Sequence, residues 1–417
     1  MAGSESTIGA LLDETGGSIK TGPFGTKLKA SEYTATGVPV ISVGEVGFGR
    51  LHVHHDTPRV DDTVSSRMPE YLLKAGDIVF GRKGAVERSA QVQPDEDGYF
   101  LGSDGIRIRL NVEECDPKFI SYQLQTTAHR SWMIQHAAGT TMPSLNEGII
   151  RRIPIVLKPL AEQKAIAAVL GSLDDKIELN RRMNVTLEAM ARALFQSWFV
   201  DFDPVRAKLD GRQPVGLDQA TAALFPESFE ETAFGHVPNG WGRKTLGEIV
   251  ELAYGKPLKA EDRKHGSVCV YGANGPVGWH DEKLVSGPGI VVGRKGKPGV
   301  VTWAHGDFYP IDTTFYVKPI GTCRSLYFLY YALSLHNLAN LSADSAVPGL
   351  NRNHAYMSKQ VIPSQPVLTA FDSQIAPIFA AIHANEEQSR SLALARDTLL
   401  PKLISGELTV RVKASSE

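Results

Sequence analysis

Features that would place a chain outside the cell or in a membrane are scarce in this sequence. Its 417 residues include three cysteines, Cys115, Cys269 and Cys323, which are widely spaced and form no CxxC pair. This pattern argues against a disulfide framework or a structural zinc site and favours a reducing compartment. The first residues lack the basic and apolar regions of a signal peptide, and the longest strongly apolar run, 327–335, is far shorter than a membrane span. We therefore expect a cytoplasmic protein with no membrane segment.

Motifs of catalysis are also missing. No GxxxxGK[ST] loop occurs, which speaks against that class of ATP site. The segment DFDP at 201–204 is similar to an amino-methyltransferase motif but lacks its second proline and aromatic residue, and no glycine-rich cofactor loop precedes it. The acidic segments 94–97 and 281–283 lack the spaced acid, acid, lysine order of nucleases, and the histidines within 52–55 have no further ligands beside them. We expect a non-catalytic protein without a metal site.

What remains is the composition of a globular protein, with 42% hydrophobic and 22% charged residues. A chain of this length is too long for one core and indicates two or three domains. The formal net charge of −2 neither announces nor excludes a nucleic-acid partner, because phosphate contacts need only local clusters of Lys and Arg.

The most regular pattern is a heptad seam, which predicts one long helix over 160–202. Pro159 precedes this segment and Pro204 ends it. From Glu162 to Trp198, at about 1.5 Å per residue, the helix spans roughly 55 Å, which is longer than a small domain is wide, so it projects from or bridges the globular parts. A polar pair in the middle of the seam is expected to fix register or partner at some cost in stability. The seam positions are Ile166, Leu170, Leu173, Ile177, Asn180, Asn184, Leu187, Ala191, Leu194 and Trp198.

A second helix, predicted over 367–406, repeats this design after a shift of 209 residues. Two long helices with matching seams would most simply pack against each other, and we expect Asn180 and Asn184 to face Ser389 and Glu386. The second seam consists of Ile375, Phe379, Ile382, Glu386, Ser389, Ala393, Arg396, Leu400 and Leu403.

The globular segments repeat as well. IVFGRKG at 78–84 matches IVVGRKG at 290–296, and MPSLN at 142–146 matches VPGLN at 347–351. Both copies lie in segments of short predicted strands with one amphipathic helix, at 119–136 and 325–341. Such a long period indicates duplication of a whole domain plus helix. We expect domains at 1–158 and 239–365, helices at 159–204 and 366–410, a linker with local helix at 205–238, and a tail at 411–417.

The repeated GRKG turns and the repeated PxLN loops are the strongest candidates for a binding site. Glycines permit a tight turn and close backbone approach, while Arg and Lys can reach a phosphate or the O6 and N7 atoms of guanine. Hydroxyl and amide side chains of the PxLN loops suit phosphate positioning. The alternatives are a solvated hairpin turn and a simple turn into the next strand. The candidate DNA-binding residues are Lys27, Arg82, Lys83, Gly84, Arg88, Thr140, Thr141, Ser144, Asn146, Arg294, Lys295, Lys297, Asn351, Arg352 and Asn353.

Three motifs give the chain a family resemblance: PLAEQ at 159–163, LDDKIELN at 173–180 and SWFVDFDP at 197–204. Together with LLKAGDIVFGRKGAV at 72–86, they resemble the specificity (S) subunit of type I restriction-modification enzymes. The second copy of PLAEQ departs from the pattern, because it reads QPVLTAFDSQ at 365–374. Its partner contacts are therefore expected to differ from those of the first copy.

The resemblance implies an α+β protein in which two similar mixed α/β target recognition domains are separated by a pair of long antiparallel coiled-coil helices. Each domain would read one half of a bipartite, asymmetric double-stranded DNA site, with the helices setting the gap. Two methylation (M) subunits would dock and methylate adenine with S-adenosylmethionine, and restriction (R) subunits would use ATP and magnesium. The chain itself would hold no cofactor. Two alternatives stay open, a coiled-coil scaffold without a DNA role and a DNA enzyme with an unrecognised catalytic centre.

Overall fold

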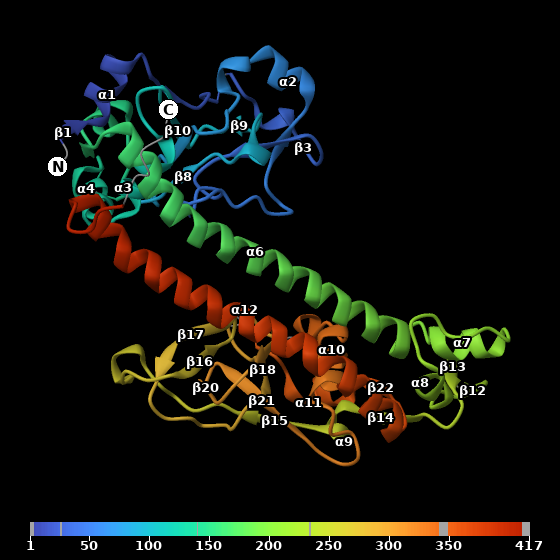
Figure 1. Ribbon diagram of the computed structural model, residues 1–417. Coiled ribbons are helices and arrows are strands. Elements are labelled where there is room, and N and C mark those ends of the chain that lie inside the picture. Colours follow the sequence, from blue (N-terminus) through green and yellow to red (C-terminus); the bar gives the residue numbers. More distant parts are fainter. Residues whose placement is uncertain (1–3, 26, 140, 233–234, 342–348, 411–417) are drawn as a thin grey trace, which may run out of the picture. The chain divides into compact units, whose positions relative to one another are not determined.

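The computed structural model describes residues 4–25, 27–139, 141–232, 235–341 and 349–410. The chain divides into two compact units, Met1–Glu178 with Ser389–Glu417, and Leu179–Gln388. Each unit contains one β-rich domain and one half of each of two long helices, α6 (Leu160–Phe199) and α12 (Gln365–Ser405). The fold is therefore of the expected α+β class, with two β-rich domains and a pair of long helices (Figure 1).

The first unit is built on three sheets. The largest is a five-stranded sheet in the order β2 (Ser18–Thr21), β10 (Gly105–Arg109), β7 (Ile78–Gly81), β8 (Ser89–Gln91) and β5 (Phe48–Gly49). A four-stranded sheet has the order β3 (Tyr33–Thr34), β6 (Arg59–Val60), β4 (Val38–Ile41) and β9 (Phe100–Leu101). The third is the pair β1 (Ser4–Thr7) and β11 (Pro154–Leu157). The helices of this unit, besides those of the long pair, are α1 (Ile8–Thr15), α2 (Asp62–Arg67), α3 (Pro117–Gln125), α4 (Thr127–His136) and α5 (Glu147–Arg151).

The helix expected over 119–136 is broken in two at Thr126. This residue has an extended conformation, with ψ at 150°, and its hydroxyl accepts a hydrogen bond from the backbone N–H of His129. A threonine side chain that satisfies a free N–H group starts a new helix at this point. The single amphipathic helix was therefore a wrong prediction.

The second unit is likewise built from small sheets of short strands and from short helices. Its sheets are β15 (Val250–Tyr254), β21 (Thr314–Pro319), β18 (Gly289–Gly293) and β19 (Val301–Ala304); β17 (Gly275–His280), β16 (Val268–Gly272) and β20 (Phe308–Pro310); and the pairs β14 (Gly242–Thr245) with β22 (Lys359–Ile362) and β12 (Phe229–Thr232) with β13 (Gly235–Pro238). Its short helices are α7 (Asp203–Leu209), α8 (Gln219–Ala223), α9 (Leu246–Ile249), α10 (Leu326–Leu335) and α11 (Arg352–Met357).

Two expectations for this unit need correction. The helix expected over 325–341 ends at Leu335, and a short 3-10 helix follows over Leu338–Leu341. The segment 205–238 holds the β12–β13 hairpin in addition to local helix, and Val205, Phe225 and Val237 are buried in the same core as Trp198. Apolar residues in this segment thus pack as part of the second unit.

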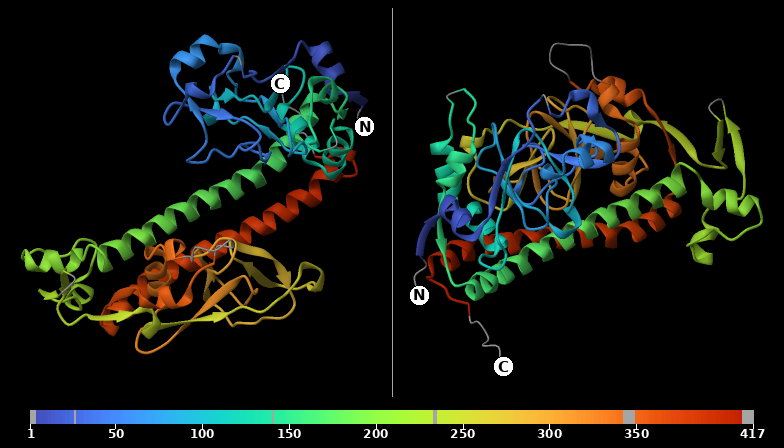
Figure 2. Two further views of the ribbon diagram at one scale, coloured as in Figure 1. Left: turned by 180° about the vertical axis from the view of Figure 1, so that it is seen from behind. Right: turned by 90° about the horizontal axis from the view of Figure 1, so that it is seen from above.

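The two long helices run side by side, as the views of Figure 1 and Figure 2 agree. In the first unit, Ile166 and Leu170 of α6 share a core with Leu400 and Leu403 of α12. In the second unit, Trp198 of α6 shares a core with residues near the start of α12, including Ile375 and Phe379. The first half of α6 thus meets the second half of α12 and the reverse, which is antiparallel pairing. All ten predicted seam positions of α6 are buried or half-buried.

The polar middle of the seam has its own hydrogen bonds. The amide of Asn180 donates to Oε1 of Gln388 at 2.9 Å, and the amide of Asn385 donates to Oδ1 of Asn184 at 2.8 Å. These partners lie one residue before the expected Glu386 and Ser389. A shift of 209 residues identifies positions that are equivalent in the two helices. It does not identify the positions that lie opposite each other, because these depend on how the antiparallel helices pack.

Helix α12 also contains an apolar window of 18 residues. Its mean hydropathy over 18 residues is 1.3, enough by length and composition to cross a membrane, and 33% of this window is buried in the structure. The apolar residues of α12 pack in the cores of the two units, together with residues of α6, as in a core helix of a globular protein.

Candidate functional site

The GRKG turn of the first unit follows β7. Gly84 has φ at +76°, a left-handed conformation that favours glycine, and a Cβ at Gly81 would lie 2.8 Å from the carbonyl oxygen of Ala85. The backbone N–H of Arg82 donates to the carbonyl of Asp104 at 2.9 Å, and its guanidinium donates to the carbonyl of Ser103 at 3.2 Å. Glycine spacing and the arginine side chain together hold the shape of this turn.

This turn is joined to the PxLN loop of the same unit, residues 143–146. The N–H of Leu145 donates to the carbonyl of Arg82 at 2.8 Å, and the N–H of Gly84 donates to the carbonyl of Pro143 at 2.9 Å. Lys83 and Ser144 form an isolated β-bridge. The two segments that the sequence singled out separately thus form one structural unit.

The second unit repeats the arrangement after β18. Gly296 has φ at +82°, and the N–H of Arg294 donates to the carbonyl of Thr313 at 2.9 Å. Leu350 donates to the carbonyl of Arg294 at 2.9 Å, and Lys295 forms an isolated bridge with Gly349. The same turn and loop are therefore joined by equivalent hydrogen bonds in both units. The second PxLN loop spans 348–351, and Pro348 lies outside the described residues.

Each turn also carries an exposed aromatic ring that sequence reasoning missed. The guanidinium carbon of Arg82 lies 4.9 Å from the ring centre of Phe24, which is 56% exposed. That of Arg294 lies 4.8 Å from the ring of Tyr254, which is 50% exposed, and Arg352 lies 5.1 Å from the same ring. These distances are within the range of a cation–π contact. A third repeat, FGTKLKA at 24–30 and YGKPLKA at 254–260, was the signal that could have found both rings.

The candidate residues divide by exposure. The half-buried ones have contacts within the chain and are Arg82, Arg88, Ser144, Arg294, Asn351 and Arg352. The exposed ones are Lys27, Lys83, Gly84, Thr141, Asn146, Lys295, Lys297 and Asn353, and Thr140 lies outside the described residues. The exposed lysines are the candidates with the freest access to a ligand.

Several candidate residues make contacts that stabilise the fold. Asn146 caps α5, with Oδ1 accepting from the N–H of Ile149 at 2.9 Å, and Asn351 caps α11 in the same way. The alternative reading of the PxLN loops as turns therefore holds for these two side chains. Lys27 and Arg88 lie against other rings, those of Tyr71 and Phe48.

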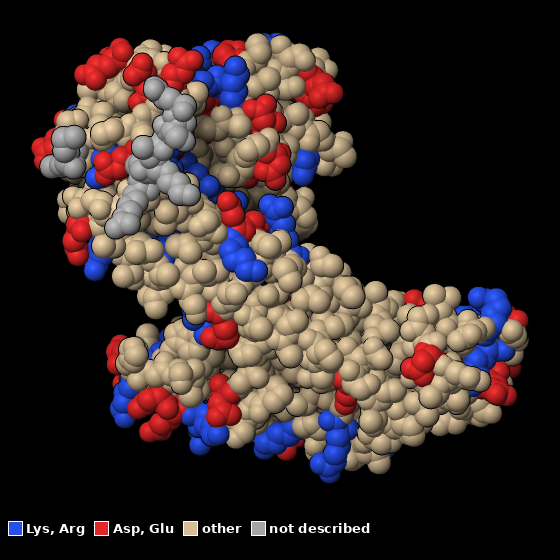
Figure 3. Space-filling model, in the orientation of Figure 1, with Lys and Arg blue, Asp and Glu red and all other residues tan. Residues whose placement is uncertain are grey.

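Charge is mixed around these segments. The ammonium of Lys83 lies 3.6 Å from the carboxylate of Asp104. On the face seen in Figure 3, Lys and Arg side chains are interspersed with Asp and Glu and do not form one continuous basic patch. In the first turn, the charge of Lys83 is thus partly offset by the neighbouring carboxylate of Asp104.

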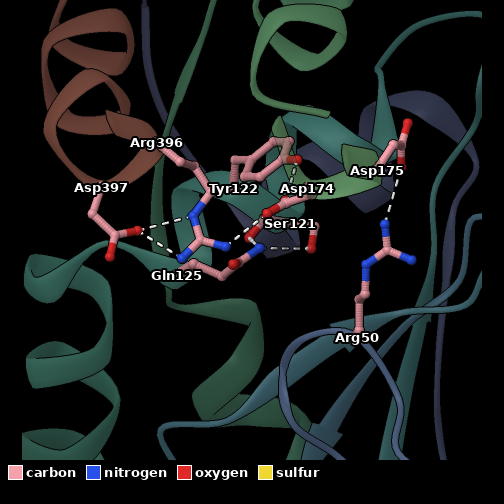
Figure 4. A network of polar contacts seen from close by, with 8 residues as sticks. All are labelled: Arg50, Ser121, Tyr122, Gln125, Asp174, Asp175, Arg396 and Asp397. Carbon is pink, nitrogen blue, oxygen red and sulfur yellow. Dashed lines mark hydrogen bonds and ion pairs between the residues drawn. The ribbon is translucent and has the colours of Figure 1, made fainter. Parts of the chain in front are cut away.

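The first domain is fastened to the long helices by a polar network (Figure 4). The hydroxyl of Tyr122 on α3 donates to the carboxylate of Asp174 on α6 at 2.6 Å, and Arg396 of α12 donates to the same carboxylate at 2.6 Å. Arg50 pairs with Asp175 at 3.0 Å. The charge of Asp174 thus joins three elements, and burial, then that charge, raises the pKa of the Tyr122 hydroxyl.

Both copies of the PLAEQ segment contact the start of a neighbouring helix, but they do so through different side chains. Oε1 of Gln163 accepts from the backbone N–H of Asp116 at the start of α3 at 2.9 Å. A shift of 209 residues leads from Gln163 to Asp372, whose carboxylate accepts a hydrogen bond from Ser325, the residue that caps α10. Burial raises the pKa of Asp372, although the Ser325 hydrogen bond lowers it in part. Within the chain, the two copies thus contact the start of the neighbouring helix through different side chains, an amide in the first and a carboxylate in the second.

The family model described as "Type I restriction modification DNA specificity domain" matches residues 23–189. The type I restriction enzyme HindI specificity subunit of Haemophilus influenzae is 27% identical over 89% of this chain and 94% of its own length. The chain belongs to the type I specificity subunits. The MjaIX specificity subunit of Methanocaldococcus jannaschii is 25% identical over 74% of this chain and 73% of its own length.

The fold is similar to that of a solved S subunit. The crystal structure of the S subunit from M. genitalium superposes with a TM-score of 0.56, at 20% identity and with 96% of each chain covered. A specificity subunit is not a catalytic subunit of its system, which agrees with the missing catalytic motifs. The site of interest is therefore a binding surface.

Proposed function

We propose that each β-rich domain of this specificity subunit reads one half of a bipartite, asymmetric double-stranded DNA site. The observation that carries this proposal is the joined GRKG turn and PxLN loop, which recurs once in each unit with the same hydrogen bonds, Leu145 to Arg82 and Leu350 to Arg294. Two readers of equal construction suit a site with two halves.

Within each turn, the arginine and the lysine have different tasks. Arg82 and Arg294 donate to backbone carbonyls and lie over aromatic rings, so they hold the turn in shape. The lysines that follow, Lys83 and Lys295, are exposed, and their ammonium groups contact phosphate oxygens. This assignment refines the expectation that all four side chains touch DNA directly.

The helix pair sets the gap between the two half-sites and docks two M subunits, which supply S-adenosylmethionine for adenine methylation. R subunits, with ATP and magnesium, complete the restriction complex in the cytoplasm. Support for these partners comes from membership of the family and from the paired helices α6 and α12, whose polar middle at Asn184 and Asn385 suits a fixed register. No residue of this chain is assigned to those cofactors.

The test is to express the chain with its M subunit and to map methylated adenines by single-molecule sequencing of host DNA. We expect a gapped, asymmetric motif that disappears when the chain is deleted. Replacing 240–364 by the matching segment of another specificity subunit should change one half of the motif and leave the other half as it was.

A matched pair of variants tests the turn itself. Lys83→Ala removes a charge after the end of β7, and Lys74→Ala removes the same charge from the exposed loop before that strand. We expect loss of DNA affinity only for Lys83→Ala. Equal affinity of both variants would contradict the assignment of the turn, and methylation that persists without the chain would favour a scaffold or an unrelated enzyme.

A further inference from the structure

Three metal-ligating side chains meet in the second unit, away from the GRKG turn. His305 follows the end of β19, while His383 and Glu386 lie on α12 three residues apart. Residues with this spacing lie on one face of a helix. The three available ligand atoms all lie within 4.8 Å of one another, and this is the one such group with three members among the described residues.

One pair of donors lies near the separation expected of two ligands on a shared ion. Nε2 of His305 lies 3.6 Å from a carboxylate oxygen of Glu386, and two donors bound to one zinc ion at about 2.0–2.2 Å lie about 3.4 Å apart in a tetrahedral site. The rings of His305 and His383 are stacked, with centres 4.8 Å apart and planes 10° from parallel. Because the ligand atoms are up to 4.8 Å apart and the rings are nearly parallel, the imidazole rings must turn for all three donors to meet one ion.

Space for a further ligand lies beside the cluster. A cavity of about 210 Å³ is bordered by His305 and Glu386, and by the rings of Trp303, Tyr330 and Phe379. A water molecule occupies about 30 Å³, so the cavity can hold a metal-bound water. The side chain of His305 is 16% exposed and that of Glu386 is 47% exposed, so an ion can enter from the solvent side of Glu386.

We propose that His305, His383 and Glu386 bind one divalent transition-metal ion, for which zinc is the natural probe. Two imidazoles and one carboxylate form a ligand set that zinc accepts, with the fourth position left to water. The ion would fasten the end of β19 to α12. Because His305 is far from the other two ligands in the chain, the sequence showed no such site, and the expectation of no metal site is replaced by this proposal.

The first unit fastens its domain differently at the equivalent place. A shift of 209 residues leads from His383 back to Asp174, which binds Tyr122 and Arg396 by hydrogen bonds. At this helix position, the first unit has an aspartate paired with the guanidinium of Arg396. The second unit has a histidine that can bind a metal cation. The inference does not depend on the proposed DNA contacts.

The experiment uses the full chain purified with its M subunits and stripped of metal by a chelator. Zinc binding is measured by calorimetry, and cobalt, whose visible absorption reports coordination geometry, replaces zinc in a second titration. The variants are His383→Ala, His305→Ala and Glu386→Gln. His236→Ala is the control, because His236 is exposed on β13 of the same unit and outside the cluster.

We expect one zinc ion per chain, bound at least tenfold more weakly by each of the three variants and unchanged in the control. Zinc should raise the melting temperature of the wild-type complex and of His236→Ala, but not that of His383→Ala. Glu386→Gln keeps the test sound if a histidine variant fails to fold, because Glu386 is partly exposed and glutamine has the same size. Equal zinc affinity in the wild type and in Glu386→Gln, or no stoichiometric binding at all, would overturn the proposal and leave the stacked histidines as packing only.

Discussion

The guanidinium groups of Arg294 and Arg352 share one aromatic ring, since they lie 4.8 and 5.1 Å from the centre of Tyr254. Arg294 belongs to the GRKG turn and Arg352 begins α11, directly after the PxLN loop. The tyrosine thus connects the two repeated segments of the second unit through their side chains, in addition to the backbone bond between Leu350 and Arg294.

Removing this ring should loosen both arginines. A cation–π contact at an exposed site contributes about 0.5–1 kcal/mol, so Tyr254→Ala should weaken binding of the cognate DNA by about 1–2 kcal/mol. Tyr254→Phe keeps the ring and is the matched control, with affinity expected to stay near that of the wild type. Fluorescence anisotropy with the complete methylation complex measures both variants. Equal losses in the two would assign the effect to the hydroxyl group and not to the ring.

Salt dependence separates phosphate contacts from other effects of the turn. Lys295 and Lys297 are exposed, and each lysine that neutralises a phosphate adds about one to the slope of log affinity against log salt concentration. The double variant Lys295→Ala, Lys297→Ala should therefore lower that slope by about two. Lys283→Ala, which removes an exposed lysine paired with Asp307, should leave the slope unchanged. A slope that is the same in all three proteins would remove these lysines from the interface.

The left-handed glycine of the turn offers a test of its shape. Gly296 has φ at +82°, where a residue with a Cβ costs about 1–2 kcal/mol, so Gly296→Ala should lower the free energy of unfolding by that amount and weaken DNA binding. Gly242→Ala is the control, because no atom lies within 4 Å of a Cβ built there and its φ is outside the left-handed region. Urea denaturation measures the first effect. If both variants lose the same stability, the special backbone of the turn is not the cause.

The elements that the sequence predicted well are those with strong local signals. The seam of α6 is buried or half-buried at every predicted position because a heptad pattern depends only on residues of one helix and its partner. The break at Thr126 was missed because a threonine cap competes with an otherwise regular amphipathic pattern. The expected and observed boundaries of the long helices differ by a few residues, as helix ends often do.

The candidate site was predicted in outline but not in its inner contacts. Repetition of the GRKG turn and PxLN loop marked both segments, yet their union through Leu145 and Arg82 is a long-range backbone contact without a sequence pattern. For the same reason, nothing in the turn itself revealed that Arg82 lies over Phe24, or that His305 meets the histidine and glutamate of α12.

The asparagine pair at the middle of the long helices should behave as a coupled unit. Asn385 donates to Asn184 at 2.8 Å, and the amide of Asn184 donates to the carbonyl of Ile382 at 3.3 Å. Either single alanine substitution leaves one half-buried amide with fewer partners, and each should cost about 1–2 kcal/mol of stability. In a double-mutant cycle the coupling energy should be about 1 kcal/mol, because the second substitution removes the group that the first left unpaired. Strict additivity of the two substitutions would show that the pair does not act together.

Asp372 gives the stability of the second unit a pH dependence of defined sign. Burial raises its pKa above the ordinary value of 3.8, so in the folded chain the protonated form is favoured relative to the unfolded chain. The contribution of this group is then fully present below the unfolded pKa and is lost as the pH rises through the folded pKa. Asp372→Asn keeps an oxygen that accepts from Ser325 and has no charge to bury, so its stability relative to the wild type should be highest near pH 7 and should decline as the pH falls toward 4.

Gln163→Glu, which places a carboxylate at the equivalent position of the first unit, should produce the opposite trend, since it introduces a charge where an amide accepts from Asp116. Chemical denaturation between pH 4 and 7 measures both differences, and a gap between Asp372→Asn and the wild type that does not vary with pH would mean that the Asp372 carboxyl does not titrate differently in the folded chain.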